Sequence, residues 1–228
     1  MSSLTGRILY EDNHILVVNK MAGELVQGDQ TGDAPLSEIV KSYIKEKYKK
    51  PGAVFLGVVH RLDRPTSGVV LFAKTSKALS RLNSQFKERI PEKTYWAVVT
   101  KEFPEIHGHL THWLTRNTKL NKSSAFDKPI AEAKEARLHF TTHSVLDRYK
   151  VLEINLETGR HHQIRAQLSH LGFPIQGDFK YGAPRSNSDG SISLHARQLK
   201  IIHPVTKENL TFTASPPDYG IWKAVPCD

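Results

Sequence analysis

The chain has 228 residues, of which 39% are hydrophobic and 24% charged, a composition that excludes an intrinsically disordered protein. Its formal net charge of +9 predicts a polyanionic partner such as a nucleic acid, because lysine and arginine gain affinity from each phosphate that they neutralise. A single cysteine, Cys227, excludes an intrachain disulfide framework and a cysteine-based zinc site. The apolar runs are too short for a signal peptide or a membrane span, so we expect a cytoplasmic protein.

Apolar patterning predicts a strand-rich chain with a few helices. In chain order, we expect strands at 7–10 and 15–19, a helix at 35–48, a strand at 69–73, a helix at 75–89, and strands at 93–99, 136–141, 149–156, 193–202 and 210–214. Residues 102–134 are more polar and less regular, with a basic loop at 117–124. This order predicts an α+β fold, with one domain over residues 1–228 built on a mixed, largely antiparallel sheet.

The sequence H-R-L-D-R-P-T-S-G at residues 60–68 places one carboxylate, Asp63, between two arginines on a tight turn. The turn lies between apolar residues 58–59 and the strand expected at 69–73, so it can hold Asp63 rigidly at the edge of a core. Catalytic groups are often held in this way, on loops that a rigid scaffold positions. A solvated loop in which Asp63 pairs with a neighbouring arginine is the alternative.

A second motif, T-G-R-H-H-Q-I-R-A-Q-L-S-H-L-G, occupies residues 158–172. Ile164, Leu168 and Leu171 share one face of the helix expected here, and Gly172 is placed to end it. Arg165 lies beside that apolar face, so its guanidinium can point inward toward a carboxylate. An arginine that extends to solvent is the alternative.

Both motifs resemble those of the RluA class of RNA pseudouridine synthases. Residues 60–68 are similar to H-R-L-D-x-x-T-S-G, and residues 158–182 to T-G-R-T-H-Q-I-R followed by L-x-x-L-G-x-P-I-x-G-D-x-x-Y-G. Residues 93–95 are similar to the class motif K-x-Y, and residues 19–23 to N-K-P-x-G, with Met21 where proline is usual. The resemblance implies a pseudouridine synthase catalytic domain whose sheet is flanked by helices and loops around a central RNA-binding cleft.

The resemblance runs from about Ile8 to Pro217. We therefore expect a form of the enzyme without the small N-terminal RNA-binding domain that some related synthases carry. The implied reaction is the isomerisation of uridine to pseudouridine in tRNA or rRNA. This reaction adds and removes no atoms, so we expect no cofactor and no metal. A monomer is expected, because one catalytic domain can supply the whole site.

The resemblance also assigns roles to individual side chains. It implies that Asp63 is the catalytic carboxylate, that Arg165 is its ion-pair partner and that Tyr95 stacks on the flipped base. Arg61 would enter the space that the base leaves. Lys20 is predicted, from its charge alone, to contact RNA phosphates. We expect Arg165→Met to cut turnover by several orders of magnitude and to leave the fold intact.

Two questions stay open at this level. The carboxylate of Asp63 can act as a nucleophile on ribose C1′ or as a base that removes a ribose proton. The protein can also be a catalytically silent RNA-binding protein on the same fold, although pure binding needs no buried carboxylate. A metallohydrolase built from the twelve histidines is not favoured, because no H-E-x-x-H or similar spacing occurs.

Overall fold

The computed structural model describes residues 4–28 and 32–226, so Cys227 lies outside the described residues. The chain forms two compact units. The first unit comprises Met1–Pro91 and Ala196–Pro216, and the second comprises Glu92–His195 and Pro217–Asp228. The single domain over 1–228 and its central cleft stay predictions. Across the described residues, no helix combines the length and the apolarity that a membrane crossing requires.

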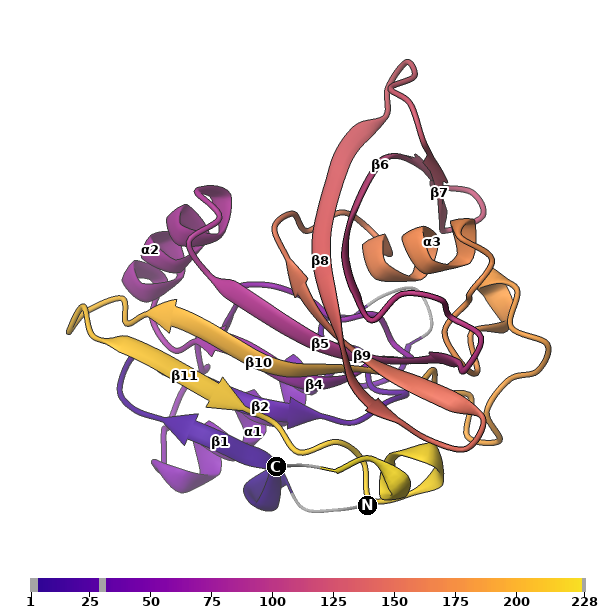
Figure 1. Cartoon of the computed structure of the whole chain (residues 1–228). Helices are drawn as coiled ribbons and strands as arrows, with labels where there is room; N and C mark the ends of the chain where they lie inside the picture. Colours follow the sequence, from indigo (N-terminus) through magenta and orange to yellow (C-terminus); the bar gives the residue numbers. More distant parts are fainter. Residues whose placement is uncertain (1–3, 29–31, 227–228) are drawn as a thin grey trace. The chain divides into compact units, whose positions relative to one another are not determined.

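The strands of the first unit follow the order β1, β2, β4, β10, and β1 and β4 each pair with β2 in the antiparallel sense (Figure 1). Short β3 pairs with β4, and β11 pairs with β10. The strands are β1 (Ile8–Glu11), β2 (Ile15–Lys20), β3 (Gly57–Val58), β4 (Ser67–Ala73), β10 (Leu194–Ile202) and β11 (Asn209–Thr213). The helices are α1 (Leu36–Lys47), α2 (Ser76–Lys87) and one 3₁₀ turn (Leu4–Arg7).

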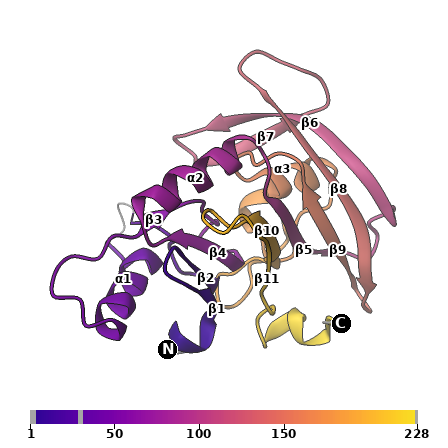
Figure 2. The same ribbon diagram turned by 90° about the vertical axis from the view of Figure 1, so that its left-hand side faces the viewer.

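Strands β2 and β4 carry the core of the first unit, because nearly all of their side chains are buried on both faces of the sheet. Helix α2 begins where the Thr75 hydroxyl accepts a hydrogen bond from the Ala78 N–H at 3.1 Å, as an N-cap residue does. Helix α2 lies beside β4 (Figure 2). Ala78 and Leu82 on its apolar face belong to one buried cluster with Leu71 of β4. The strand after the Asp63 turn therefore starts in a rigid, fully packed environment.

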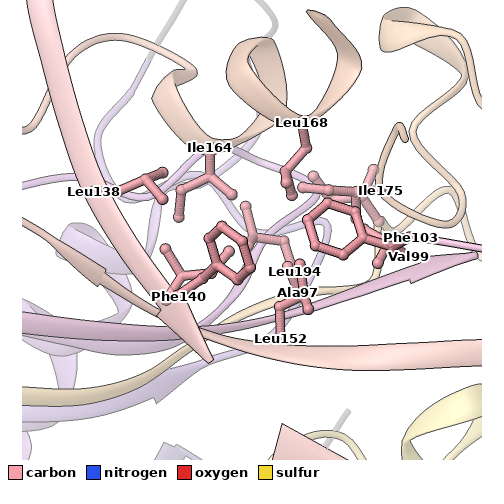
Figure 3. Packing of buried hydrophobic residues seen from close by; sticks show 12 residues of the cluster. Ala97, Val99, Phe103, Leu138, Phe140, Leu152, Ile164, Leu168, Ile175 and Leu194 are labelled. Atoms are coloured by element: carbon pink, nitrogen blue, oxygen red, sulfur yellow. The ribbon is translucent and has the colours of Figure 1, made fainter. Parts of the chain in front are cut away.

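The second unit is an antiparallel sheet in the order β5, β9, β8, β6, β7. Its strands are β5 (Glu92–Thr100), β6 (His107–Asn117), β7 (Lys122–Phe126), β8 (Lys134–Val145) and β9 (Tyr149–Leu156). Its helix is α3 (Gln163–His170), with 3₁₀ turns at Phe179–Tyr181 and Gly220–Ala224. Figure 3 shows Ile164 and Leu168 of α3 pointing at the sheet, where they pack with Phe140 in one buried cluster.

These elements confirm the α+β fold and most of the expected strands and helices. The interpretation of residues 102–134 as irregular is wrong, because β6 and β7 lie there as a hairpin. In β6 only His112 and Leu114 are buried, so no apolar run marks the strand in the sequence. Leu171 is 38% exposed and does not complete the buried face of α3, whereas Gly172 takes a positive φ of 84° just after the helix, as expected.

Candidate active site

Asp63 lies on a closed turn between β3 and β4. The Thr66 N–H donates to the Asp63 main-chain oxygen at 3.0 Å, which closes the turn. Leu62 before it and Thr66 and Ser67 after it are buried, whereas Asp63 itself is half-buried and Arg61 is exposed. The carboxylate is thus carried by a fixed backbone and keeps partial access to solvent, which is what a group that must meet a substrate needs.

Lys20, the last residue of β2, forms hydrogen bonds with the main chain of this turn. Its side chain is completely buried, and Nζ donates to the main-chain oxygens of Met21 at 3.0 Å, Arg64 at 3.2 Å and Thr66 at 2.6 Å. Because the ammonium is enclosed by three carbonyl groups, it is not available to a phosphate. The prediction that Lys20 contacts RNA is therefore corrected: its place is inside the protein, where it ties the turn to the end of β2.

Burial lowers the pKa of Lys20 to about 8, against the ordinary 10.5, although the negative charges of Glu24 and Asp63 favour its protonated form. Between pH 8 and pH 10.5 the unfolded chain therefore binds more protons than the folded one, and this residue makes stability rise with pH. As the pH rises through that window, we expect the free energy of unfolding of the wild type to increase by about 1–3 kcal/mol relative to that of Lys20→Met. Denaturant titrations at several pH values would measure it. Lys45→Met, which removes an exposed lysine, is the control, and parallel pH profiles for wild type and Lys20→Met would contradict the prediction.

The segment at residues 19–23 is bonded to the Asp63 turn on a second side. The Gly23 N–H donates to the Arg64 main-chain oxygen at 2.8 Å, and Arg64 Nε donates back to the Gly23 oxygen at 3.0 Å. The N–H of Met21, where the class motif has proline, donates to Glu24 Oε2 at 2.9 Å, a bond that proline cannot make. Met21 therefore supplies a local hydrogen bond in place of the rigid proline ring, and the neighbouring turn is retained.

His60 anchors the other end of the motif. The Leu71 N–H donates to His60 Nε2 at 3.1 Å, which makes this nitrogen an acceptor, and the ring stacks on Phe86 of α2 at 5.2 Å between ring centroids. His60 thus contacts both strand β4 and helix α2 of the first unit. Each end of the H-R-L-D turn is fixed by a contact that the sequence motif does not reveal.

Gly68 allows β4 to approach β10 closely. Its φ is +119°, and a Cβ atom placed there would lie 2.3 Å from the main-chain oxygen of Ala196. We expect Gly68→Ala to lower the free energy of unfolding by on the order of 3 kcal/mol, because both backbone strain and a backbone clash oppose the methyl group. Denaturant midpoints would test this against Gly52→Ala, whose new methyl group meets no atom within 4 Å. Equal midpoints for the two variants would refute it.

Arg165, on α3 in the second unit, is buried and forms a bidentate ion pair. Its Nε donates to Asp178 Oδ2 at 2.7 Å and its second guanidinium nitrogen donates to Asp178 Oδ1 at 2.8 Å. Arg165 is 4% and Asp178 1% exposed, and the guanidinium lies 4.9 Å from the centre of the Tyr181 ring. Asp178 and Tyr181 belong to the G-D-x-x-Y-G segment, so the motif marks both, but sequence reasoning gave neither a role.

Tyr181 connects α3 to the β6–β7 hairpin. Its hydroxyl accepts a hydrogen bond from the Ser123 N–H at 2.8 Å and contacts His162 Nδ1 at 2.9 Å. Ser123 also contacts His161 through Nδ1 at 2.9 Å and donates to its main-chain oxygen at 2.8 Å. His161 stands where the class motif has threonine, and its Nε2 lies 3.1 Å from Asn121 Oδ1. The basic turn of the hairpin is therefore bonded to the N-terminus of the helix that carries Arg165.

Tyr95 lies on β5, opposite Ile154 of β9, and is partly buried against the core of the second unit. Of the five candidate residues, Asp63, Arg61 and Lys20 thus belong to the first unit, and Tyr95 and Arg165 to the second. The structure bears out the rigid setting of Asp63 and the inward orientation of Arg165. The pairing of these two residues and the stacking role of Tyr95 stay predictions.

Comparisons with known proteins agree on one family. A sequence model described as RNA pseudouridylate synthase matches residues 14–170. Ribosomal large subunit pseudouridine synthase C of Buchnera aphidicola is 34% identical over 225 residues, covering 96% of this chain and 69% of that protein. The tRNA pseudouridine synthase C of Vibrio parahaemolyticus is 31% identical over 236 residues, covering 94% and 92%. An uncharacterized RNA pseudouridine synthase of Synechocystis is 34% identical over 214 residues, which make up 92% of this chain. The matched part covers only 65% of that relative's length.

Among solved structures, human RNA pseudouridylate synthase domain containing 4 is similar with a TM-score of 0.77 at 24% identity, over 94% of this chain and 90% of that one. A second human protein, RNA pseudouridylate synthase domain containing 1, is similar with a TM-score of 0.72 at 24% identity, over 93% and 83%. These likenesses concern the fold.

Proposed function

Since this chain belongs to the RNA pseudouridylate synthase family, in its RluA class, we propose that it isomerises uridine to pseudouridine in RNA. The observation that carries this proposal is the setting of Asp63, a half-buried carboxylate on a turn that Lys20, Gly23 and His60 hold from three sides. A turn that only joined two strands would not need a buried lysine beneath it, because burying an ammonium costs free energy that its hydrogen bonds must offset.

The reaction requires few groups. The bond between ribose C1′ and base N1 breaks, the uracil turns, C1′ bonds to C5, and the C5 hydrogen is lost as a proton while N1 gains one. The carboxylate of Asp63 would act on the ribose, either by attack on C1′ or by removal of a ribose proton. Both routes conserve all atoms of the nucleotide, so neither an oxidant nor a phosphate donor takes part.

Arg165 and Tyr95 would serve the same reaction from the second unit. Arg165 would pair with Asp63, and its two hydrogen bonds to Asp178 support this role because they fix the Arg165 side chain. Tyr95 would stack on the flipped uracil, an interaction worth about 1–3 kcal/mol. Arg61, exposed on the Asp63 turn, would occupy the gap that the flipped base leaves.

We place the substrate among transfer RNA and ribosomal RNA, and the protein in the cytoplasm as a monomer. The net charge of +9 supports an RNA substrate. The names of the relatives divide between the two RNA classes, and selectivity in such enzymes depends on loop contacts and RNA shape. The hairpin turn at residues 118–121, where Asn121 contacts His161 just before α3, is one place where such contacts can act on the site.

Pseudouridine mapping of total RNA tests the function directly. In cells that lack this gene, specific pseudouridines in tRNA or rRNA should disappear and should return with the wild-type gene but not with Asp63→Ala. Restoration by Asp218→Asn, which removes a fully exposed carboxylate, controls for expression and folding. A map that is unchanged by the deletion, in a strain without a redundant synthase, would instead support a catalytically silent RNA-binding protein.

A further inference from the structure

Two histidines and a glutamate gather on the outer face of the second unit's sheet. His109 of β6 lies directly opposite His139 of β8, and their ring centroids are 5.6 Å apart. Glu157 follows the last residue of β9, and its N–H donates to the Arg137 main-chain oxygen at 3.2 Å, next to His139 on β8. We call His109, His139 and Glu157 the outer-face triad.

Strand alternation places this triad on the face opposite the buried cluster that packs against α3. On β8 the inward residues Leu138 and Phe140 are at most 2% exposed, whereas His139 between them is half-buried. His109 and Glu157 are exposed. The three side chains therefore stand on one face of three adjacent, hydrogen-bonded strands, whose backbone keeps them in register.

The triad has the spacing of a metal site. One ligand atom from each residue, an imidazole nitrogen from each histidine and a carboxylate oxygen, lies within 4.8 Å of the others. Around a tetrahedral Zn²⁺ ion with bonds of about 2.0–2.1 Å, such atoms stand about 3.3 Å apart. Small rotations of the three side chains would close that difference. Two imidazoles and one carboxylate are a common ligand set for zinc.

The ligand atoms are also available. Among the described residues, no hydrogen bond engages the ring nitrogens of His109 or His139, whose ring contact is with each other. Arg137 Nε donates to Glu157 Oε2 at 2.8 Å, which leaves Oε1 for an ion and fixes the carboxylate. Hydrogen bonds of this kind, from a neighbouring side chain to a ligand, orient the ligands in many metal sites.

A second group, His112, Asp127 and His170, has similar spacing but different chemistry. Gln167 Nε2 lies 3.1 Å from His112 Nδ1, and an amide nitrogen can only donate, so the proton of a neutral His112 resides on Nε2. Nε2 is the atom that faces Asp127, at 3.6 Å, while His170 Nε2 lies 2.8 Å from the same carboxylate oxygen. The Asp127 carboxylate is therefore hydrogen-bonded to His170, and His112 presents an N–H rather than a lone pair on that side.

Reversal of the Gln167 amide would not free His112. The amide nitrogen also donates toward the main-chain oxygens of Leu110 and Ala136, at 3.4 and 3.2 Å. A reversed amide would direct its own oxygen at those two carbonyl groups, which is repulsive. The two histidine groups are therefore distinguishable: one offers free nitrogen atoms, and the other has its nitrogen atoms in use.

We propose that the outer-face triad of His109, His139 and Glu157 binds Zn²⁺, with water in the open fourth position. The ion ties β6, β8 and the end of β9 together and stabilises the second unit. This site is separate from the proposed isomerase reaction and assigns the metal no part in it. Because the ligands come from β6, β8 and the residue after β9, no H-E-x-x-H type of spacing marks them in the sequence.

Calorimetric titration of the purified, untagged protein with ZnCl₂ tests the proposal. We expect one equivalent to bind with a Kd on the order of 1–10 μM, and His139→Gln to weaken binding by about 10-fold or more. His170→Gln, in the second histidine group, is the matched control and should bind as the wild type does. Co²⁺ should give the intense visible absorption of a tetrahedral site with the wild type and His170→Gln, but not with His139→Gln.

The same variants give a readout on stability. Zn²⁺ should raise the Tm of the wild type and of His170→Gln, because an ion that binds only the folded state stabilises it, and should leave His139→Gln unchanged. Binding that survives His139→Gln, or that is lost in His170→Gln, would overturn the assignment. So would the absence of any Zn²⁺ binding by the wild type below about 100 μM.

Discussion

Asp63→Asn is expected to lower the rate of pseudouridine formation by at least about 10³-fold and to leave RNA affinity within a few-fold of the wild type. Asparagine has nearly the same shape as aspartate, but its amide is neither a nucleophile nor a base. The turn should survive the change, because the hydrogen bond that closes it uses the main-chain oxygen of residue 63 and not the side chain. Loss of rate without loss of binding is the signature of a group that acts in the transition state.

Single-turnover release of tritium from RNA labelled at uracil C5 measures this rate, because that hydrogen leaves when C5 bonds to the ribose. Asp218→Asn, a substitution at an exposed carboxylate, should release tritium as the wild type does. Turnover by Asp63→Asn above about one tenth of the wild-type rate would remove Asp63 from the reaction.

The pKa of Lys20 provides an independent check that the Asp63→Asn variant is folded. The Asp63 charge favours the ammonium form of Lys20, so its removal should lower the pKa of that lysine further. Nuclear magnetic resonance of the lysine side chain, labelled at Cε, would detect the shift. A variant that shows this shift has kept Lys20 beneath the turn, so its lost activity cannot be ascribed to unfolding.

The second large effect is expected for Arg165→Met, which should cost both activity and stability. The sequence alone predicts an intact fold, but the structure places Asp178, 1% exposed, against the guanidinium with two hydrogen bonds. Without Arg165 that carboxylate would be buried with its charge uncompensated. Loss of one partner of a buried pair typically costs about 3–5 kcal/mol.

A double variant separates the two roles of Arg165. In Arg165→Met/Asp178→Leu both buried charges are gone, and a buried pair replaced by apolar groups is often neutral for stability. We expect the double variant to regain most of the lost denaturant midpoint and to stay at least about 10²-fold below wild type in tritium release. Recovered turnover in the double variant would show that Arg165 acts only through the fold, and the proposed pairing with Asp63 would then be wrong.

Much of this molecule follows from local sequence. The apolar run before and after the turn at residues 60–68 predicts β4, and the mixed pattern at Tyr149–Leu156 predicts β9 with its observed bounds. Gly172 predicts the end of α3 to within two residues. Such features depend on side-chain periodicity and on turn chemistry between neighbours, which a single sequence displays. The two long motifs likewise identify the family.

The tertiary structure decided what each charged side chain does. Lys20 has the same charge as any surface lysine, and only the packing of residues 64 and 66 over it shows that it is buried. Arg165 meets Asp178 because a loop returns to α3, and His109 meets His139 because β6 pairs with β8. Burial and the convergence of ligands depend on residues far apart in the chain. The sequence by itself therefore determined the family and the local elements, whereas the environment of each functional group was set by long-range packing, which controls solvation, charge and access.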